Sequence, residues 1–206
     1  MRFGRLLRSP PGMGVHDGRS SITAGLGGQC GGGGAREQRL LSSPTLVEIQ
    51  RGSLNDALRI AERSVASAEQ ARAHDLEAAG VACMGFVNFW RGEFRRVAWC
   101  VDQGISASER GGERSMAEAR MLLLGLAGAA AGRRGDMEST ASAFDEGLRE
   151  ASAHGHRDLE GALRLLRAET TVAFDAPRAL GDAQQALAAF DAKKAPWWAQ
   201  WARRCM

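Results

Sequence analysis

The chain of 206 residues is long enough for one domain with a sizeable core, and its formal net charge is +3. The first forty residues hold six arginines and two acidic residues, so the remainder is close to neutral, which argues against direct nucleic-acid binding. The longest apolar run, 121–132, is shorter than the roughly 20 residues that span a membrane, and no apolar segment follows the N-terminal arginines as a secretion signal requires, so we expect a cytoplasmic protein.

Residues 1–37 are predicted to form a disordered tail rich in glycine and arginine. Eleven of the first 34 residues are glycine, and such a segment buries too little apolar surface to offset the entropy lost on ordering. The glycines match neither of the common phosphate-binding motifs, GxxxxGK(S/T) and GxGxxG, so we expect no nucleotide cofactor here. The folded domain is expected to cover residues 38–206.

From residue 38 onward the sequence predicts helices. Alanine is abundant, β-branched residues are sparse and tyrosine is absent, which favours helix over strand. Apolar residues recur every three or four positions, as from Leu54 through Leu58 and Ala61 to Val65, and this is the spacing of a helical stripe. Glycine or proline marks most of the helix ends. The predicted helices cover residues 44–49, 54–73, 76–90, 94–110, 115–133, 137–153, 159–174, 176–190 and 197 onward.

The segment 120–153 reads as a pair of helices joined by a tight turn, and the pattern recurs 43 residues earlier. A shift by 43 positions superimposes three glycines on three glycines. The matched pairs are Gly85 with Gly128, Gly92 with Gly135, and Gly104 with Gly147. A glycine inside a helix costs about 1 kcal/mol relative to alanine, so the recurrence of the first and third pairs indicates that neighbouring helices approach closely there.

The turns that follow the first helix of each pair fall at Gly52, Gly92, Gly135 and close to Phe174, with spacings of 40, 43 and 39 residues. Repeats of this length in an all-helical chain predict a solenoid of antiparallel helix pairs. We place the repeats at about 51–90, 91–133 and 134–174, with a partial repeat at 175–206.

These small-residue columns resemble the tetratricopeptide repeat (TPR), in which small residues recur within the first helix, at the turn and within the second helix. The unit is longer than the 34-residue form and is similar to the roughly 40-residue variant in MalT-like, LuxR-type bacterial regulators. The resemblance covers about residues 51–206 and implies a right-handed α-solenoid. The family's tryptophan, leucine-glycine and tyrosine signature is incomplete, and its proline after the second helix is missing.

In the family, the first helices of the pairs line a concave face that holds peptides. Carried over, this places Phe86, Phe89 and Trp90 toward that face, with Arg133 matching Trp90 after the 43-residue shift and Arg164 one turn before the position that matches Phe86. The alternative is that these aromatic residues are ordinary core between repeats. Asn88 is the one hint of the family's peptide-carboxylate clamp, and the clamp's lysines are absent, so that activity is not predicted.

No catalytic, metal or cofactor site is predicted. His154 and His156 lie in a turn without an evident third ligand, and Asp145-Glu146 reads as part of a solvated face. No nucleophile motif is present. The four cysteines have neither metal nor disulfide spacing and are interpreted as free thiols in a reducing compartment, with a redox pair of Cys83 and Cys100 as the alternative.

The last aromatic residues are Trp197, Trp198 and Trp201, and we expect their helix to pack on Leu187 and Phe190. The apolar surface that this packing leaves exposed is expected to contact a further repeat of a longer protein or to mediate self-association. The sequence therefore predicts a non-catalytic interaction or scaffold module of a bacterial regulatory or signalling system, which binds a protein or peptide in the groove of the first helices. The alternative is an effector-sensing repeat module of a larger ATP-dependent transcriptional regulator.

Overall fold

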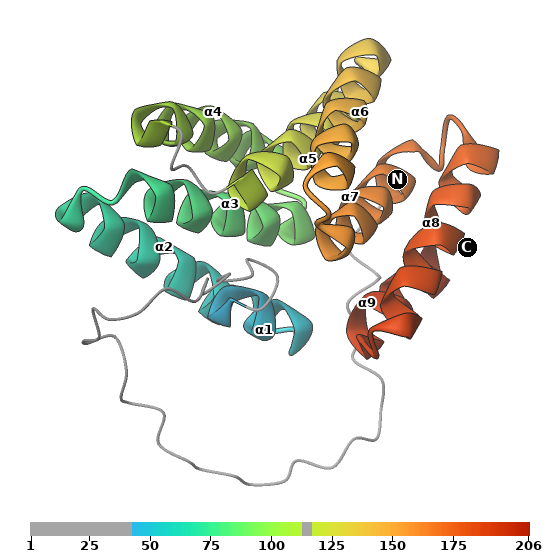
Figure 1. Cartoon of the computed structure of the whole chain (residues 1–206), viewed down its shortest axis with the longest axis horizontal. Helices are drawn as coiled ribbons and strands as arrows, with labels where there is room; N and C mark the ends of the chain where they lie inside the picture. The colour runs from blue at the N-terminus through green and yellow to red at the C-terminus, as the bar shows by residue number, and fades with distance from the viewer. Residues whose placement is uncertain (1–42, 113–116) are drawn as a thin grey trace, which may run out of the picture. The chain divides into compact units, whose positions relative to one another are not determined.

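The computed structural model describes residues 43–112 and 117–206, and the predicted tail at 1–37 lies outside these residues. The described residues form helices and no strand, which confirms the all-α prediction. The helices are α1 (Pro44–Gln50), α2 (Leu54–Ala71), α3 (His74–Arg91), α4 (Phe94–Gly111), α5 (Ala117–Arg133), α6 (Met137–Ala153), α7 (Arg157–Thr171), α8 (Ala176–Ala192) and α9 (Pro196–Cys205) (Figure 1).

The helix ends differ from the predicted ones by up to three residues, and two junctions illustrate the difference. Helix α2 ends two residues early because Arg72 takes the left-handed conformation, with φ of +52°, and α3 then begins at His74. Helix α7 ends at Thr171 and not at 174, because the next residues form the connection to α8. In that connection the Asp175 side chain accepts a hydrogen bond from the Arg178 N–H at 3.1 Å and caps α8.

One turn geometry joins most of the helices. At the α3–α4 junction, the Gly92 N–H donates to the Phe89 carbonyl and the Glu93 N–H donates to the Asn88 carbonyl, at 3.0 and 2.9 Å. This pair of bonds closes the end of a helix when the next residue is left-handed, a conformation that glycine adopts without steric cost. The same pattern occurs where φ is positive at Gly52, Arg72, Gly92, Gly135, Gly155 and Lys194.

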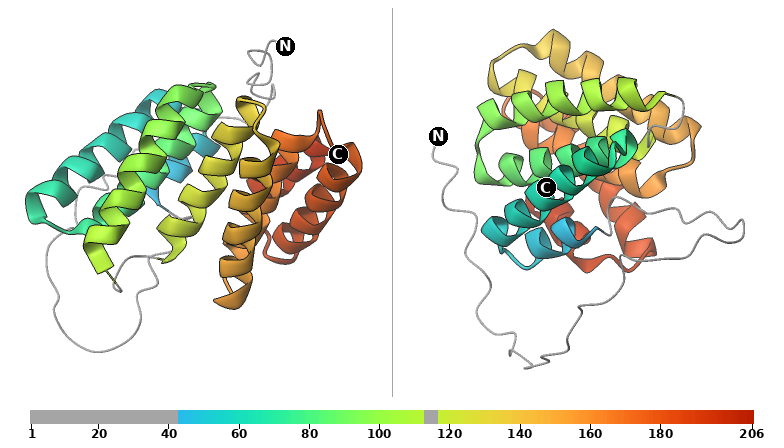
Figure 2. Two further views of the ribbon diagram at one scale, coloured as in Figure 1. Left: turned by 90° about the horizontal axis from the view of Figure 1, so that it is seen from above. Right: turned by 90° about the vertical axis from the view of Figure 1, so that its left-hand side faces the viewer.

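The helices pack in two rows. Each helix packs against the next one in the chain, as expected for stacked helix pairs, and the odd-numbered helices also pack against the odd-numbered helix two places further on. Helices α1, α3, α5, α7 and α9 thus form an inner row, and α2, α4, α6 and α8 form an outer row (Figures 1 and 2). None of the described helices combines the length and apolar character that a membrane crossing requires.

The recurring helical glycines lie where two helices touch. A Cβ atom on Gly128 would lie 2.7 Å from Cδ2 of Phe144 on α6, and one on Gly85 would lie 2.9 Å from Leu126 on α5. In the second helix of each pair, a Cβ on Gly104 would lie 2.6 Å from Leu123 and one on Gly147 would lie 3.3 Å from Leu124. Each of these four positions thus brings a neighbouring helix into close contact, which is the packing reason that the sequence predicted.

Candidate functional site

Helix α3 is the most deeply buried helix of the inner row, and it presents two faces to different neighbours. Phe86 and Trp90 lie on one face, whereas Met84 and Asn88 lie about 200° away around the helix axis. Phe86 and Phe89 are buried and Trp90 is half-buried. The predicted partner-binding aromatics therefore do not form an open surface in this structure.

Helix α9 covers the aromatic face of α3. The ring of Trp198 stacks on Phe86 at a centroid distance of 6.1 Å, and Trp201 meets Trp90 edge to face at 4.7 Å. Trp198 also stacks on Phe190 of α8, at a centroid distance of 5.3 Å. We call the whole set the aromatic cluster, and its members are Phe86, Phe89, Trp90, Phe94, Phe190, Trp197, Trp198 and Trp201.

This packing gives the three tryptophans of α9 an intramolecular role. Trp198 and Trp201 are about 5% and 4% exposed, and Trp197 is half-buried. Favourable aromatic pairs contribute about 0.5–1.5 kcal/mol each beyond the apolar area that they bury. Both the predicted self-association through these residues and the predicted binding at Phe86 would therefore require α9 to separate from α3.

Polar contacts join α9 to α7. The Glu169 carboxylate on α7 accepts hydrogen bonds from Trp201 Nε1 at 3.3 Å and from Cys205 Sγ at 3.4 Å. Trp90 Nε1, by contrast, is buried and has no hydrogen-bond partner among the described residues. Leaving a buried donor unpaired costs about 1–3 kcal/mol. This face of α3 therefore contains a hydrogen-bond donor that an added acceptor could pair with.

The two predicted arginines lie in different surroundings. The Arg133 guanidinium lies over the ring of Phe94 at 4.6 Å, next to the aromatic cluster, and burial lowers its pKa while the nearby Glu169 carboxylate opposes that change. Arg164 contacts Glu160 and Asp182 instead, at 2.7 and 3.3 Å. The structure thus brings Arg133 to the aromatic residues and directs Arg164 toward α8.

A buried ion pair on α7 and α8 was not predicted from the sequence. Arg167 donates two hydrogen bonds to Asp182, at 2.6 and 2.7 Å, and both residues are buried. A third bond joins Arg167 to Asp145 of α6 at 2.8 Å. A signal was present, because both charged residues of the pair occupy positions within the apolar stripe of their helices, where an unpaired charge would be costly.

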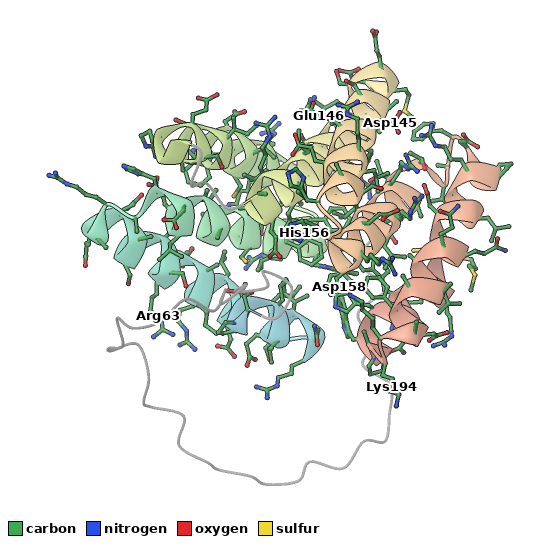
Figure 3. The ribbon with its side chains drawn as sticks, viewed as in Figure 1. Arg63, Asp145, Glu146, His156, Asp158 and Lys194 are labelled. Atoms are coloured by element: carbon green, nitrogen blue, oxygen red, sulfur yellow. The ribbon has the colours of Figure 1, made fainter. Side chains whose placement is uncertain are left out.

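The acidic pair Asp145-Glu146 does not form a joint carboxylate site. Asp145 pairs with arginines of α7 and α8, whereas Glu146 pairs with Arg120 of α5 at 3.0 Å. Figure 3 labels both acids on α6. The interpretation of these acids as a solvated face is therefore incomplete for Asp145, which lies at a contact between helices. Because the two carboxylates bind different arginines, they are not available for shared acid–base chemistry.

The two histidines of the α6–α7 turn also bind separate partners. The ring nitrogen Nδ1 of His154 lies 2.9 Å from the Glu150 carbonyl oxygen, and Nδ1 of His156 lies 3.4 Å from a Glu118 carboxylate oxygen. In residues 43–112 and 117–206, no group of three or more histidine, cysteine, aspartate or glutamate side chains is arranged to hold a metal ion.

The cysteines of the described residues are free; Cys83 and Cys100 are buried and Cys205 is half-buried. Burial raises the pKa of Cys83 and of Cys100 to about 11, and burial together with the Glu169 carboxylate raises the pKa of Cys205 to about 12. Cys83 lies 3.5 Å from the Ser43 hydroxyl, whereas Cys100 accepts from the Asn88 amide at 4.0 Å. These thiols behave as small core residues with little thiolate at neutral pH.

Comparisons with protein-family models, with curated proteins and with solved structures found no match to this chain.

Proposed function

We propose that this chain is a non-catalytic protein-interaction module of a bacterial regulatory or signalling system, built as a right-handed TPR-like solenoid. Its partner is an amphipathic helix with aromatic residues on one face, which binds the inner row in place of α9. The free cysteines are in keeping with action in the reducing cytoplasm.

The observation that carries this proposal is the position of α9. It is a ten-residue helix whose aromatic residues at positions i, i+1 and i+4 pack on Phe86 and Trp90. The inner row therefore already holds one amphipathic helix, by the same helix-in-groove contacts that proteins use for peptide partners. A partner with the same aromatic spacing would find complementary surface there once α9 has moved.

The unpaired Trp90 Nε1 suggests how a partner helix could bind this surface more tightly than α9 does. A partner helix with a glutamine or glutamate next to its aromatic residues would accept a hydrogen bond from this buried N–H. Such a bond to a neutral or charged acceptor contributes about 0.5–3 kcal/mol, a factor of about 2 to 150 in affinity. This gain would offset part of the cost of displacing α9, which otherwise lowers the apparent affinity.

The test uses a fluorescent peptide of residues 195–206 and the full chain. Trp201→Leu weakens the chain's own α9 and leaves the surface of α3 unchanged, so we expect the peptide to bind this variant at least about tenfold more tightly than the original chain. Fluorescence anisotropy measures the dissociation constants, and circular dichroism verifies that the variant remains helical.

The matched control is Gln200→Ala, which changes an exposed residue of the same helix. The Gln200→Ala variant should bind the peptide as weakly as the original chain does. Equal peptide binding by the original chain and a folded Trp201→Leu variant would contradict the proposal, because it would mean that α9 and the peptide do not compete for one surface.

A further inference from the structure

Residues of α2, α3 and α4 line a concave surface whose floor is the opposite face of α3. Helix α3 lies between the outer-row helices α2 and α4 (Figure 1). We call the concave surface the outer groove, and its volume is about 420 Å³, within the range of roughly 300–1,000 Å³ that is usual for ligand sites. Its apolar lining includes Leu58 and Val65 of α2 and Met84 of α3. It shares no lining residue with the aromatic cluster, so binding in the outer groove is independent of the proposed function.

The charged residues that line the outer groove are two glutamates and one arginine. Glu62 and Glu69 are exposed on α2 and lie two turns apart on the side that lines the groove. The one basic residue of the lining, Arg96, already forms an ion pair with Glu93 at 3.0 Å. The two glutamates therefore leave an excess of negative charge over an apolar floor.

Asn88 adds a buried acceptor to this floor. Its side chain is only 2% exposed, and its amide N–H group donates to the Met84 carbonyl at 3.0 Å and to Cys100 Sγ at 4.0 Å. These contacts fix the orientation of the amide and leave Oδ1 without a partner among the described residues. A buried carbonyl oxygen without a donor contributes partial negative charge to its surroundings and is itself costly to leave unpaired.

Trp99 completes the groove on the α4 side. Its indole ring is 53% exposed although it lies at the edge of an apolar lining. The face of an exposed indole attracts cations, and the attraction is stronger where water is excluded. A surface ion pair alone contributes little to binding, so the selectivity of the groove would come from the combination of charge, aromatic face and apolar floor.

We propose that the outer groove binds a protein segment through a lysine or arginine side chain that is flanked by aliphatic residues. The aliphatic part of that side chain and its neighbours pack on Leu58, Val65 and Met84. The cationic end lies between Glu62, Glu69 and the Trp99 ring and directs N–H groups toward the floor that contains Asn88. This assigns the chain a basic-segment site on the outer row, separate from the helix-binding surface of the inner row.

The experiment selects peptides from a phage-displayed random library on the folded full chain and measures the affinity of the recovered peptides by anisotropy. We expect the recovered peptides to be enriched in lysine or arginine next to leucine, isoleucine, valine or methionine. Glu62→Gln and Glu69→Gln should each weaken their binding about three- to tenfold, and Trp99→Leu should weaken it by a similar factor. All three residues are exposed, so thermal melts should show folded variants.

Asp56→Asn is the matched control. Asp56 lies on the same helix and is exposed, but it pairs with Arg59 at 2.7 Å and does not line the groove, so its loss should leave peptide affinity unchanged. The proposal would be overturned if the recovered peptides were not enriched in lysine or arginine. It would also be overturned if the Glu62 and Glu69 substitutions left the peptide affinity unchanged. Agmatine, a free alkylguanidinium, serves as a further probe, and binding as tight as that of the peptides would assign the groove to a small cation instead.

Discussion

At the residue scale, small side chains decide how closely the helices of this chain approach. Gly128 and Gly104 are not conformationally special, but each lies under a large side chain of a neighbouring helix. Gly181 of α8 is a useful contrast, since an added Cβ there would meet no atom within 4 Å. Helical glycines in this chain therefore fall into two kinds, those required by packing and those that only lower helix propensity.

Alanine substitutions should separate these two kinds. Gly128→Ala places a Cβ against the Phe144 ring, at 2.7 and 2.8 Å from two ring carbons, and should lower the free energy of unfolding by about 1–3 kcal/mol. Gly181→Ala adds helix propensity without a clash and should raise it by about 0.5–1 kcal/mol. Urea unfolding followed by circular dichroism measures both. Equal effects of the two substitutions would contradict the packing role of Gly128.

The three thiols of the described residues, two of them buried and Cys205 half-buried, should react slowly in the folded chain. With pKa values raised from 9.0 to about 11 or 12, their thiolate fraction at pH 8 falls by a factor of about 100 or more. A Cys30→Ser variant removes the cysteine outside the described residues, and its reaction with a thiol reagent should be at least about 100-fold faster in denaturant than in buffer. Rapid labelling of the folded variant would show that these thiols are accessible.

The raised pKa values of the three thiols also determine how the free energy of unfolding changes with pH. The folded chain retains the three thiol protons at a pH where the unfolded chain loses them, so the contribution of these groups to stability is unchanged below pH 9 and falls as the pH rises above it. Replacing Cys83, Cys100 and Cys205 by alanine should flatten the decrease in unfolding free energy between pH 9 and pH 11. A profile that remains equally steep would assign the alkaline loss to other groups.

At the scale of elements, a buried ion pair joins α7 to α8 at a junction without the recurring left-handed turn. The α7–α8 connection uses the Asp175 cap, and next to it the Arg167–Asp182 pair joins the two helices and reaches Asp145 on α6. A buried pair of this kind specifies one arrangement of its helices more than it adds net stability, because each charge gives up its hydration.

A double-mutant cycle should measure the energetic coupling between Arg167 and Asp182. Arg167→Met or Asp182→Leu alone leaves a buried charge without its main partner and should cost about 3–5 kcal/mol, while the double substitution should cost less than either single one. The exposed pair Arg203–Asp191 is the control, and the same two kinds of change there should cost less than about 1 kcal/mol each. Additive effects at Arg167 and Asp182 would show that the pair is not coupled in solution.

At the scale of the whole helical domain, the contact between α3 and α9 distinguishes this chain from a simple repeat array. In such an array each repeat contacts only its neighbours, so stability is nearly a sum of local terms. Here Phe86 and Trp198, 112 positions apart along the chain, stack on each other. The described helices should therefore unfold as one unit and not repeat by repeat.

Hydrogen exchange should detect this long-range coupling. Trp198→Ala removes the stack on Phe86 and should raise the exchange rates of the α3 amides about as much as those of α9. Phe174→Ala changes an aromatic residue that is 61% exposed and should leave both helices unaffected. Faster exchange confined to α8 and α9 would contradict a coupling that reaches α3.

The amino-acid sequence by itself determined the helices, most of their turns and the close helix contacts at the recurring glycines. These features depend on interactions within a few residues or between successive helices. Gly92 and Gly135 illustrate this, since each permits a left-handed turn that its own neighbours complete. The periodic apolar residues likewise predict which side of each helix is buried.

Three features became apparent only in the folded structure. Helix α9 covers Phe86 and Trp90, Arg164 belongs to the Arg167–Asp182 network, and a groove lined by two glutamates lies on the other face of α3. These outcomes depend on the summed angles at which successive helices pack, and those angles follow from the shapes of many side chains together. A local pattern predicts that a tryptophan is buried, but the partner that buries it is determined by the geometry of all the helices between them.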